Sequence, residues 1–168
     1  MARTIDSDRK HLQGVLQAAA DHRGAAFIEI YQNCPIFNDD AWAAVTEPEA
    51  RDEHVIRLEH GEPIRFGANR GRGLRFTRYG SLEAVDAASA DAGSLLTHDA
   101  HAADPSYAFA LSRLDSSDFA HTPIGVFRQV PRPSYDDLMA EQLETARAQL
   151  GDGDLAALLA GGDTWQVG

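Results

Sequence analysis

Apolar residues predict a helix and then a short buried strand in the first part of the chain. Across residues 7–23 they recur at helical intervals, at Leu12, Val15, Leu16 and Ala19. Asp6 or Ser7 is the expected N-cap, and Gly24 is expected to end the helix. Residues 25–31 form a mostly apolar run, which predicts a strand. One helix and one strand cannot form a doubly wound sheet, so further strands are expected on the N-terminal side.

Shorter apolar segments predict further strands and helices in the middle of the chain. Strands are expected at residues 54–59, 63–66, 74–78, 82–87, 94–98 and 124–130. The alanine-rich run 84–92 is equally compatible with a short helix. Helices are expected at 41–45 and 105–114, and the charged segment 46–53 is interpreted as a surface connection. This alternation predicts an α/β fold.

The last part of the chain has a purely helical pattern. From Ser134 onward the apolar positions are Leu138, Leu143 and Leu150, separated by charged residues. A second short helix is expected at residues 152–159. We therefore expect a helical tail, in which Trp165 offers an anchor.

Composition and charge exclude several classes of protein. The 168 residues carry a net charge of −11, which argues against nucleic acid or an anionic membrane as a partner. A single cysteine excludes an internal disulfide framework and favours a reducing compartment. No segment approaches the ~20 apolar residues of a membrane helix, and the first residues lack a signal-peptide core. We expect a cytoplasmic protein.

The polar turn after residues 25–31 carries the strongest candidate chemistry. In open α/β sheets, ligands bind beyond the carboxyl ends of the strands, and Cys34 follows such an end closely. A lone cysteine can equally be a buried structural thiol. Pro35 favours a ligand, because proline also follows a ligand cysteine in bacterial ferredoxins. Asn33, Phe37 and Asn38 are interpreted either as turn formers and a core phenylalanine or as part of a cofactor pocket.

Two other groups of residues are weaker candidates. The metal-ligating residue types His98, Asp99, His101 and Asp104 lie close together. A surface loop, with Asp104 as a helix cap, is the preferred interpretation. Residues 67–73 and their flanks hold Arg65, Arg70, Arg72 and Arg75, which predict either anion capture or a solvated hairpin loop.

The sequence around Cys34 resembles a known enzyme family. Residues 29–39, Glu-Ile-Tyr-Gln-Asn-Cys-Pro-Ile-Phe-Asn-Asp, are similar to the β subunit of the 2-oxoacid:ferredoxin oxidoreductases, most closely the 2-oxoglutarate type. The resemblance continues through residues 56–61, 98–101, 105–111 and 162–165. It covers nearly the whole chain.

The resemblance implies cofactors and a place for this chain in the subunit. The family uses thiamine diphosphate with magnesium and a four-iron four-sulfur cluster, of which Cys34 would be the last ligand. Asn33, Phe37 and Asn38 would shape the pocket between cluster and thiamine. The other three cysteines and the thiamine Gly-Asp-Gly motif precede this part in the family, so the chain is expected to be a C-terminal segment. Gly151-Asp152-Gly153 lies between expected helices and is not that motif.

The resemblance also implies a domain organisation and a function. Residues 1–38 would end a doubly wound thiamine-binding domain, 39–133 would form an α+β cap, and 134–168 the helical tail. The complete enzyme would decarboxylate 2-oxoglutarate or pyruvate oxidatively, with coenzyme A as acyl acceptor and ferredoxin as electron acceptor. An α subunit is the expected partner, and the isolated chain is expected to be inactive and without cofactors. The alternative is an interaction or regulatory module that binds an oxidoreductase subunit.

Overall fold

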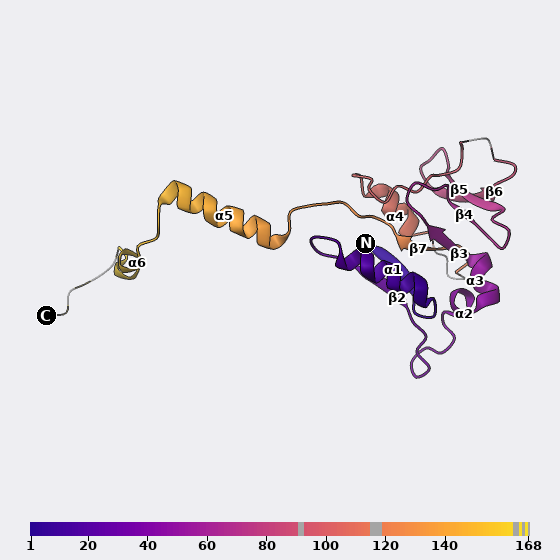
Figure 1. Ribbon diagram of the computed structural model, residues 1–168, viewed down its shortest axis with the longest axis horizontal. Helices are drawn as coiled ribbons and strands as arrows, with labels where there is room; N and C mark the ends of the chain where they lie inside the picture. The colour runs from indigo at the N-terminus through magenta and orange to yellow at the C-terminus, as the bar shows by residue number, and fades with distance from the viewer. Residues whose placement is uncertain (91–92, 115–118, 163–164, 166, 168) are drawn as a thin grey trace. The chain divides into compact units, whose positions relative to one another are not determined.

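The computed structural model describes residues 1–90, 93–114, 119–162, 165 and 167. The chain divides into two compact units, Met1–Pro131 and Arg132–Gly168. The first unit holds the sheets and most helices, and the second is helical (Figure 1).

A four-stranded mixed sheet forms the centre of the first unit. Strand β1 (Ala2–Ile5), helix α1 (Arg9–Ala20) and strand β2 (Ile28–Tyr31) make a parallel β–α–β unit. Strand β7 (Thr122–Val126) pairs antiparallel with β1 and parallel with β3 (Val55–Leu58). The strand order is therefore β2-β1-β7-β3 (Figure 1).

Strand β1 lies before the expected helix, in a segment for which the sequence pattern predicts no element. Its four residues are all buried, including Arg3, whose guanidinium lies 2.6 Å from Glu29 on β2. The boundaries of α1 also differ from those expected. Asp8 is the N-cap, with its side chain accepting from the His11 amide, and the helix ends at Ala20, before Gly24.

A second, three-stranded antiparallel sheet packs in the other half of this unit. It has the order β4 (Arg65–Phe66), β5 (Arg72–Phe76) and β6 (Leu82–Asp86). The strand expected at residues 94–98 is absent apart from a single bridge between Pro63 and Thr97. Apolar side chains from both sheets and from helix α4 form one core, namely Ile56, Leu58, Ile64, Phe66, Leu74, Ala108, Leu111 and Phe127.

Helix α4 spans Ser106–Ser112. The Asp104 carboxylate accepts from the Ser106 amide at 2.7 Å, at the start of this helix. This contact agrees with the interpretation of Asp104 as a helix cap. The structure thus gives Asp104 a local role in the backbone.

Two short helices follow the Cys34 turn. Helix α2 spans Ala43–Thr46, close to the expected position. The segment interpreted as a surface connection instead forms helix α3, Pro48–His54, with Pro48 in its first turn. Helix α2 contributes Val45 to a second core on the four-stranded sheet, made of Ile5, Tyr31, Val45, Val55 and Ile124.

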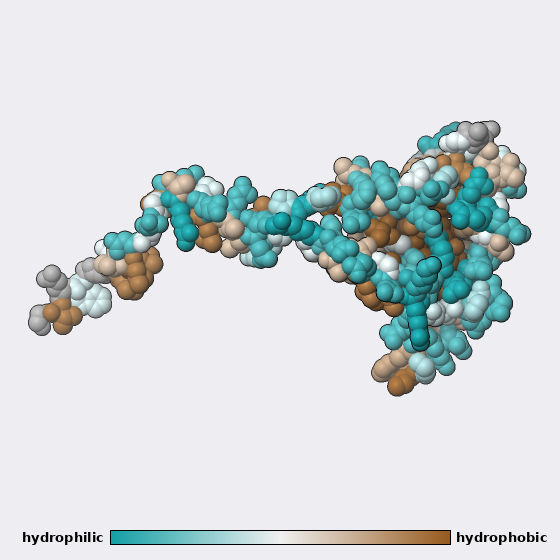
Figure 2. Space-filling model, in the orientation of Figure 1, coloured by the Kyte–Doolittle hydropathy of each residue, from teal (hydrophilic) through white to brown (hydrophobic). Residues whose placement is uncertain are grey.

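The second unit consists of helix α5 (Tyr135–Leu150) and helix α6 (Leu155–Ala160), as the apolar spacing predicts. Ser134 and Asp137 form a reciprocal capping box at the start of α5. No described side chain in this unit is buried, and Trp165 is exposed, so the expected anchoring by Trp165 is not seen within the unit. Figure 2 shows hydrophobic residues on the surface of both helices.

The described residues together form a mixed α/β fold, as predicted. None of the helices in the described ranges has the length and apolar character needed to cross a lipid bilayer.

Candidate functional site: the thiol turn after strand β2

The base of the Cys34 turn is held by aromatic packing. Strand β2 ends at Tyr31, whose ring stacks on Trp42 with 4.1 Å between ring centroids. Phe119 packs edge-on against both rings, at 6.3 Å from Tyr31 and 5.0 Å from Trp42. Both ends of the connection from β2 to α2 are therefore fixed to the core.

Hydrogen bonds close the turn itself. The Asn38 amide donates to the Cys34 carbonyl at 2.9 Å, and the two residues form an isolated bridge. Across the turn, the Asn33 side-chain amide donates to the Asp39 carboxylate at 2.9 Å and its oxygen accepts from the Asp40 amide at 3.0 Å. The interpretation of Asn33 as a turn former therefore holds. Residues 33–40 form a small closed loop that presents the thiol.

The tip of this loop is apolar and exposed. Ile36 is 85% exposed and Phe37 is 89% exposed, so the interpretation of Phe37 as a core residue is wrong. Figure 2 shows a hydrophobic surface at the lower tip of the first unit, over the loop that follows β2. Phe27, which precedes β2, is also 66% exposed. Exposed side chains of this size suit a contact surface better than bulk water.

Cys34 is free and partly buried, and it is the one cysteine of the sequence. Among the described residues, no group of three or more His, Cys, Asp or Glu side chains is arranged to hold a metal ion. A four-iron four-sulfur cluster takes four thiolate ligands. The residues of this chain therefore fit one corner of such a cluster, and the other ligands would have to come from outside it.

The two histidines singled out in the sequence have structural partners. His98 is fully buried, with Nε2 facing the Val126 carbonyl at 2.8 Å and Nδ1 facing the Tyr107 hydroxyl at 3.0 Å. Burial lowers the pKa of His98 and raises the pKa of Tyr107 to about 12, so a neutral ring meets a protonated hydroxyl. His101 faces the Gln129 carbonyl at 2.7 Å. His98 has no ring nitrogen left for a metal ion.

The arginines near residues 67–73 have different surroundings. Arg72 and Arg75 each face a glutamate, at 3.8 Å and 2.7 Å. Arg65 and Arg70 line a pocket on the surface of the first unit. The structure therefore divides the four arginines into two pairs: Arg72 and Arg75 form ion pairs, and Arg65 and Arg70 face a pocket.

The same pocket includes Arg51 and Arg57, which sequence reasoning missed. Arg51 lies on α3, a segment interpreted as a connection. Arg57 lies on β3, between the buried residues Ile56 and Leu58. Because side chains alternate between the two faces of a strand, Arg57 points to the opposite face. That alternation is the signal by which the sequence could have revealed Arg57. It indicates that the side chain is exposed and does not indicate a pocket.

Comparison with known proteins identifies one close relative. The chain is 47% identical over 169 residues to the 2-oxoglutarate oxidoreductase subunit KorB of Mycobacterium tuberculosis (strain ATCC 25618 / H37Rv). The alignment covers 99% of this chain and 45% of that protein, so the chain spans less than half the length of the relative. This match confirms the resemblance to the 2-oxoglutarate type. Searches found no matching protein-family model and no matching solved structure.

Proposed function

We propose that this chain, a relative of a 2-oxoglutarate oxidoreductase subunit, works as part of the β subunit of a 2-oxoacid:ferredoxin oxidoreductase. The observation that carries the proposal is the 47% identity along 99% of the chain. At this level of identity the two chains share a fold along the aligned region. The substrate would be a 2-oxoacid, with 2-oxoglutarate favoured over pyruvate by the name of the relative.

Cys34 is the residue to which we give a cofactor role. It would be one thiolate ligand of a four-iron four-sulfur cluster whose remaining ligands lie outside this chain. Such a cluster, when bound, accepts and passes on single electrons. The closed turn supports this role, because the Asn38 amide and the Asn33 side chain fix the backbone on both sides of the thiol. Phe37 and Asn38 would face the same cofactor region.

The rest of the enzyme would supply what this chain lacks. Thiamine diphosphate and magnesium would bind to the remaining part of the subunit, and an α subunit, ferredoxin and coenzyme A would complete the reaction. The exposed Ile36 and Phe37 side chains support an assembly, because a contact with another chain segment would remove them from water. We therefore expect the isolated chain to be inactive and to bind no cluster.

A chimeric subunit tests the role of Cys34. In the Mycobacterium tuberculosis subunit KorB, the aligned 45% would be replaced by this chain, and the product would be made together with its partner subunit. We expect 2-oxoglutarate-dependent reduction of a viologen dye and an electron paramagnetic resonance signal of a reduced cluster. Cys34→Ser should abolish both the signal and the dye reduction.

The matched control for Cys34→Ser is His22→Gln, because His22 follows the end of α1 and lies outside the turn. His22→Gln should keep cluster and activity. A Cys34→Ser chimera with a full iron content and an unchanged spectrum would contradict the ligand role. A folded wild-type chimera that assembles but never reduces the dye would contradict the enzyme proposal.

An interaction module is the second candidate function. The observation that favours it is the set of exposed leucines on α6, where Leu155, Leu158 and Leu159 are 68–78% exposed. As a module, the chain would bind an oxidoreductase subunit without taking part in catalysis. Size-exclusion chromatography with the partner subunit of KorB measures binding, and the chimera measures activity. For an interaction module, the wild-type chain and Cys34→Ser should bind the partner equally well, and the chimera should show no activity.

A further inference from the structure

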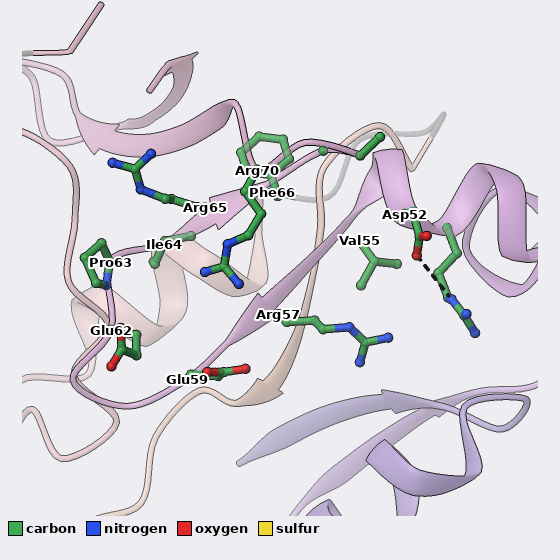
Figure 3. A pocket seen from close by; sticks show the side chains of 13 residues that line it. Asp52, Val55, Arg57, Glu59, Glu62, Pro63, Ile64, Arg65, Phe66 and Arg70 are labelled. Atoms are coloured by element: carbon green, nitrogen blue, oxygen red, sulfur yellow. Dashed lines mark ion pairs between the residues drawn. The ribbon is translucent and has the colours of Figure 1, made fainter. Parts of the chain in front are cut away.

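We propose that the first unit carries a binding site for a small oxyanion, a phosphate or a carboxylate, in the pocket beside β3 and β4. The pocket has a volume of about 160 Å³ and is independent of the Cys34 turn. Four arginines line it, namely Arg51, Arg57, Arg65 and Arg70 (Figure 3). Guanidinium groups match the geometry of both kinds of oxyanion and bind them through paired hydrogen bonds. This inference does not depend on the proposed function.

Two of the four guanidinium groups have no carboxylate within ion-pair distance among the described residues. Arg65 on β4 and Arg70 in the following loop are both exposed, and no ion pair joins either to the described part of the chain. Figure 3 shows the Arg70 side chain extending into the pocket, with Arg57 on one side and Arg65 on the other. Their charge is therefore available to a ligand.

The backbone at Arg70 is adapted to this position. Arg70 has φ +53°, a left-handed conformation that is uncommon for a residue with a side chain, and its amide donates to the Gly67 carbonyl at 2.9 Å. Strain of this kind persists only where the surroundings impose it, and it concentrates at functional sites. The tight turn brings the long side chain back over the pocket.

The other two arginines are held in place by the protein. The Arg57 guanidinium donates to the Asp8 carboxylate at 2.6 Å. Arg51 has a buried Nε with no hydrogen-bond partner among the described atoms, and a carboxylate oxygen of Asp52 lies 4.0 Å from it. The buried Nε is closed to a ligand, so Arg51 contributes its positive charge to the pocket wall.

The floor and two glutamates of the pocket set its selectivity. Val55, Ile64 and Phe66 form an apolar, buried floor, which strengthens a charge-assisted hydrogen bond above it. Glu59 and Glu62 also line the pocket, Glu59 beside Arg57 and Glu62 on the side of Arg65 (Figure 3). Their carboxylates repel an anion, so the ligand would lie against the guanidinium groups and away from these two glutamates. The small volume fits a compact anion and excludes a nucleic-acid strand.

Titration of the full 168-residue chain tests the site. Sodium pyrophosphate and sodium tricarballylate would be added separately at constant ionic strength, and the arginine Nε–H signals would be followed by nuclear magnetic resonance. We expect saturable shifts of the Arg65 and Arg70 signals with at least one of the two anions. The anion that binds more tightly then tells whether phosphate or carboxylate is preferred.

Variants at exposed positions make the test specific. Arg65→Gln with Arg70→Gln should weaken binding about tenfold or more, as expected for the loss of charge-assisted hydrogen bonds. Glu62→Gln should tighten binding, because it removes a repelling charge. Arg78→Gln is the matched control, since Arg78 lies over the Tyr79 ring outside the pocket. Shifts that stay linear and equal those caused by sodium chloride, or an Arg78→Gln variant that loses as much affinity as the double variant, would overturn the proposal.

Discussion

Gly125 occupies a position on β7 that a side chain cannot share. Its φ is +122°, and a Cβ atom there would lie 2.8 Å from the Leu58 carbonyl oxygen. Backbone on the neighbouring strand cannot move aside as the end of a flexible side chain can. The close approach of β7 and β3 therefore depends on glycine at this residue.

We predict that Gly125→Ala lowers the free energy of unfolding by about 2–4 kcal/mol, from the steric overlap and the strained φ together. Gly14→Ala is the matched control, because Gly14 lies inside α1 with open space around its missing Cβ. That change should raise stability by about 0.5–1 kcal/mol. Urea unfolding followed by circular dichroism measures both, and equal effects of the two substitutions would contradict the argument.

Single residues also show what the sequence could reveal about the candidate site. The turn with Cys34 is predictable, because a mostly apolar strand ends in two polar residues and a proline. The exposure of Phe37 is not, since hydrophobicity alone favours a core position. Arg3 is the opposite case. It is buried between the Tyr31 and Phe127 rings, at 5.1 Å and 5.4 Å, although its charge indicates the surface.

Among the described helices, all except α3 lie close to their predicted positions. Helix α5 follows from its leucine spacing and from Ser134. Helix α3 was missed because its residues are charged, although Pro48 in the first turn is a helix-start signal. Strand β1 was missed because Ala-Arg-Thr-Ile holds one large apolar residue. Its position in the middle of the sheet comes from pairing with residues far along the chain, which local patterns do not encode.

The capping box of α5 gives a prediction at the scale of one element. Ser134 accepts from the Asp137 amide, and the Asp137 carboxylate accepts from the Ser134 amide. Because α5 has no buried residue, local signals carry most of its stability. Ser134→Ala should cost the helix about 1 kcal/mol and lower the helical carbon-13 shifts of its first turn. Ser134→Thr should keep them, and first-turn shifts unchanged in Ser134→Ala would refute the role of the cap.

For the whole molecule, buried histidines predict how stability depends on pH. Burial lowers the pKa of His98 and of His11 below the value of 6.5 in an unfolded chain, and the charge of Arg57 adds to the effect at His11. At a pH between the folded and unfolded pKa values, the unfolded state therefore binds more protons than the folded state. The stabilisation from these two groups is complete above about pH 6.5 and is lost as pH falls through their folded pKa values.

We predict a free energy of unfolding that falls below pH 6.5, by at most about 1.4 kcal/mol per pH unit for each histidine. Asp8 extends the loss at lower pH. Burial acts to raise its pKa, yet the Arg57 hydrogen bond holds that pKa below 3.8, so its contribution disappears only in stronger acid. Urea unfolding at several pH values measures the profile, and His98→Gln should flatten it. A variant profile identical to that of the wild type would refute this assignment.

The place of β7 in the sheet has a consequence for how the protein is made. It is the last strand of the first unit along the chain, yet it lies between β1 and β3, and the amino group of Met1 donates to the Arg128 carbonyl at 2.8 Å. During translation, β1 leaves the ribosome more than one hundred residues before its antiparallel partner β7. Contacts so distant in sequence slow folding. Until Val126 emerges, the β1–β2 pair exposes an open edge, and a nascent chain in that state is a natural client for a chaperone.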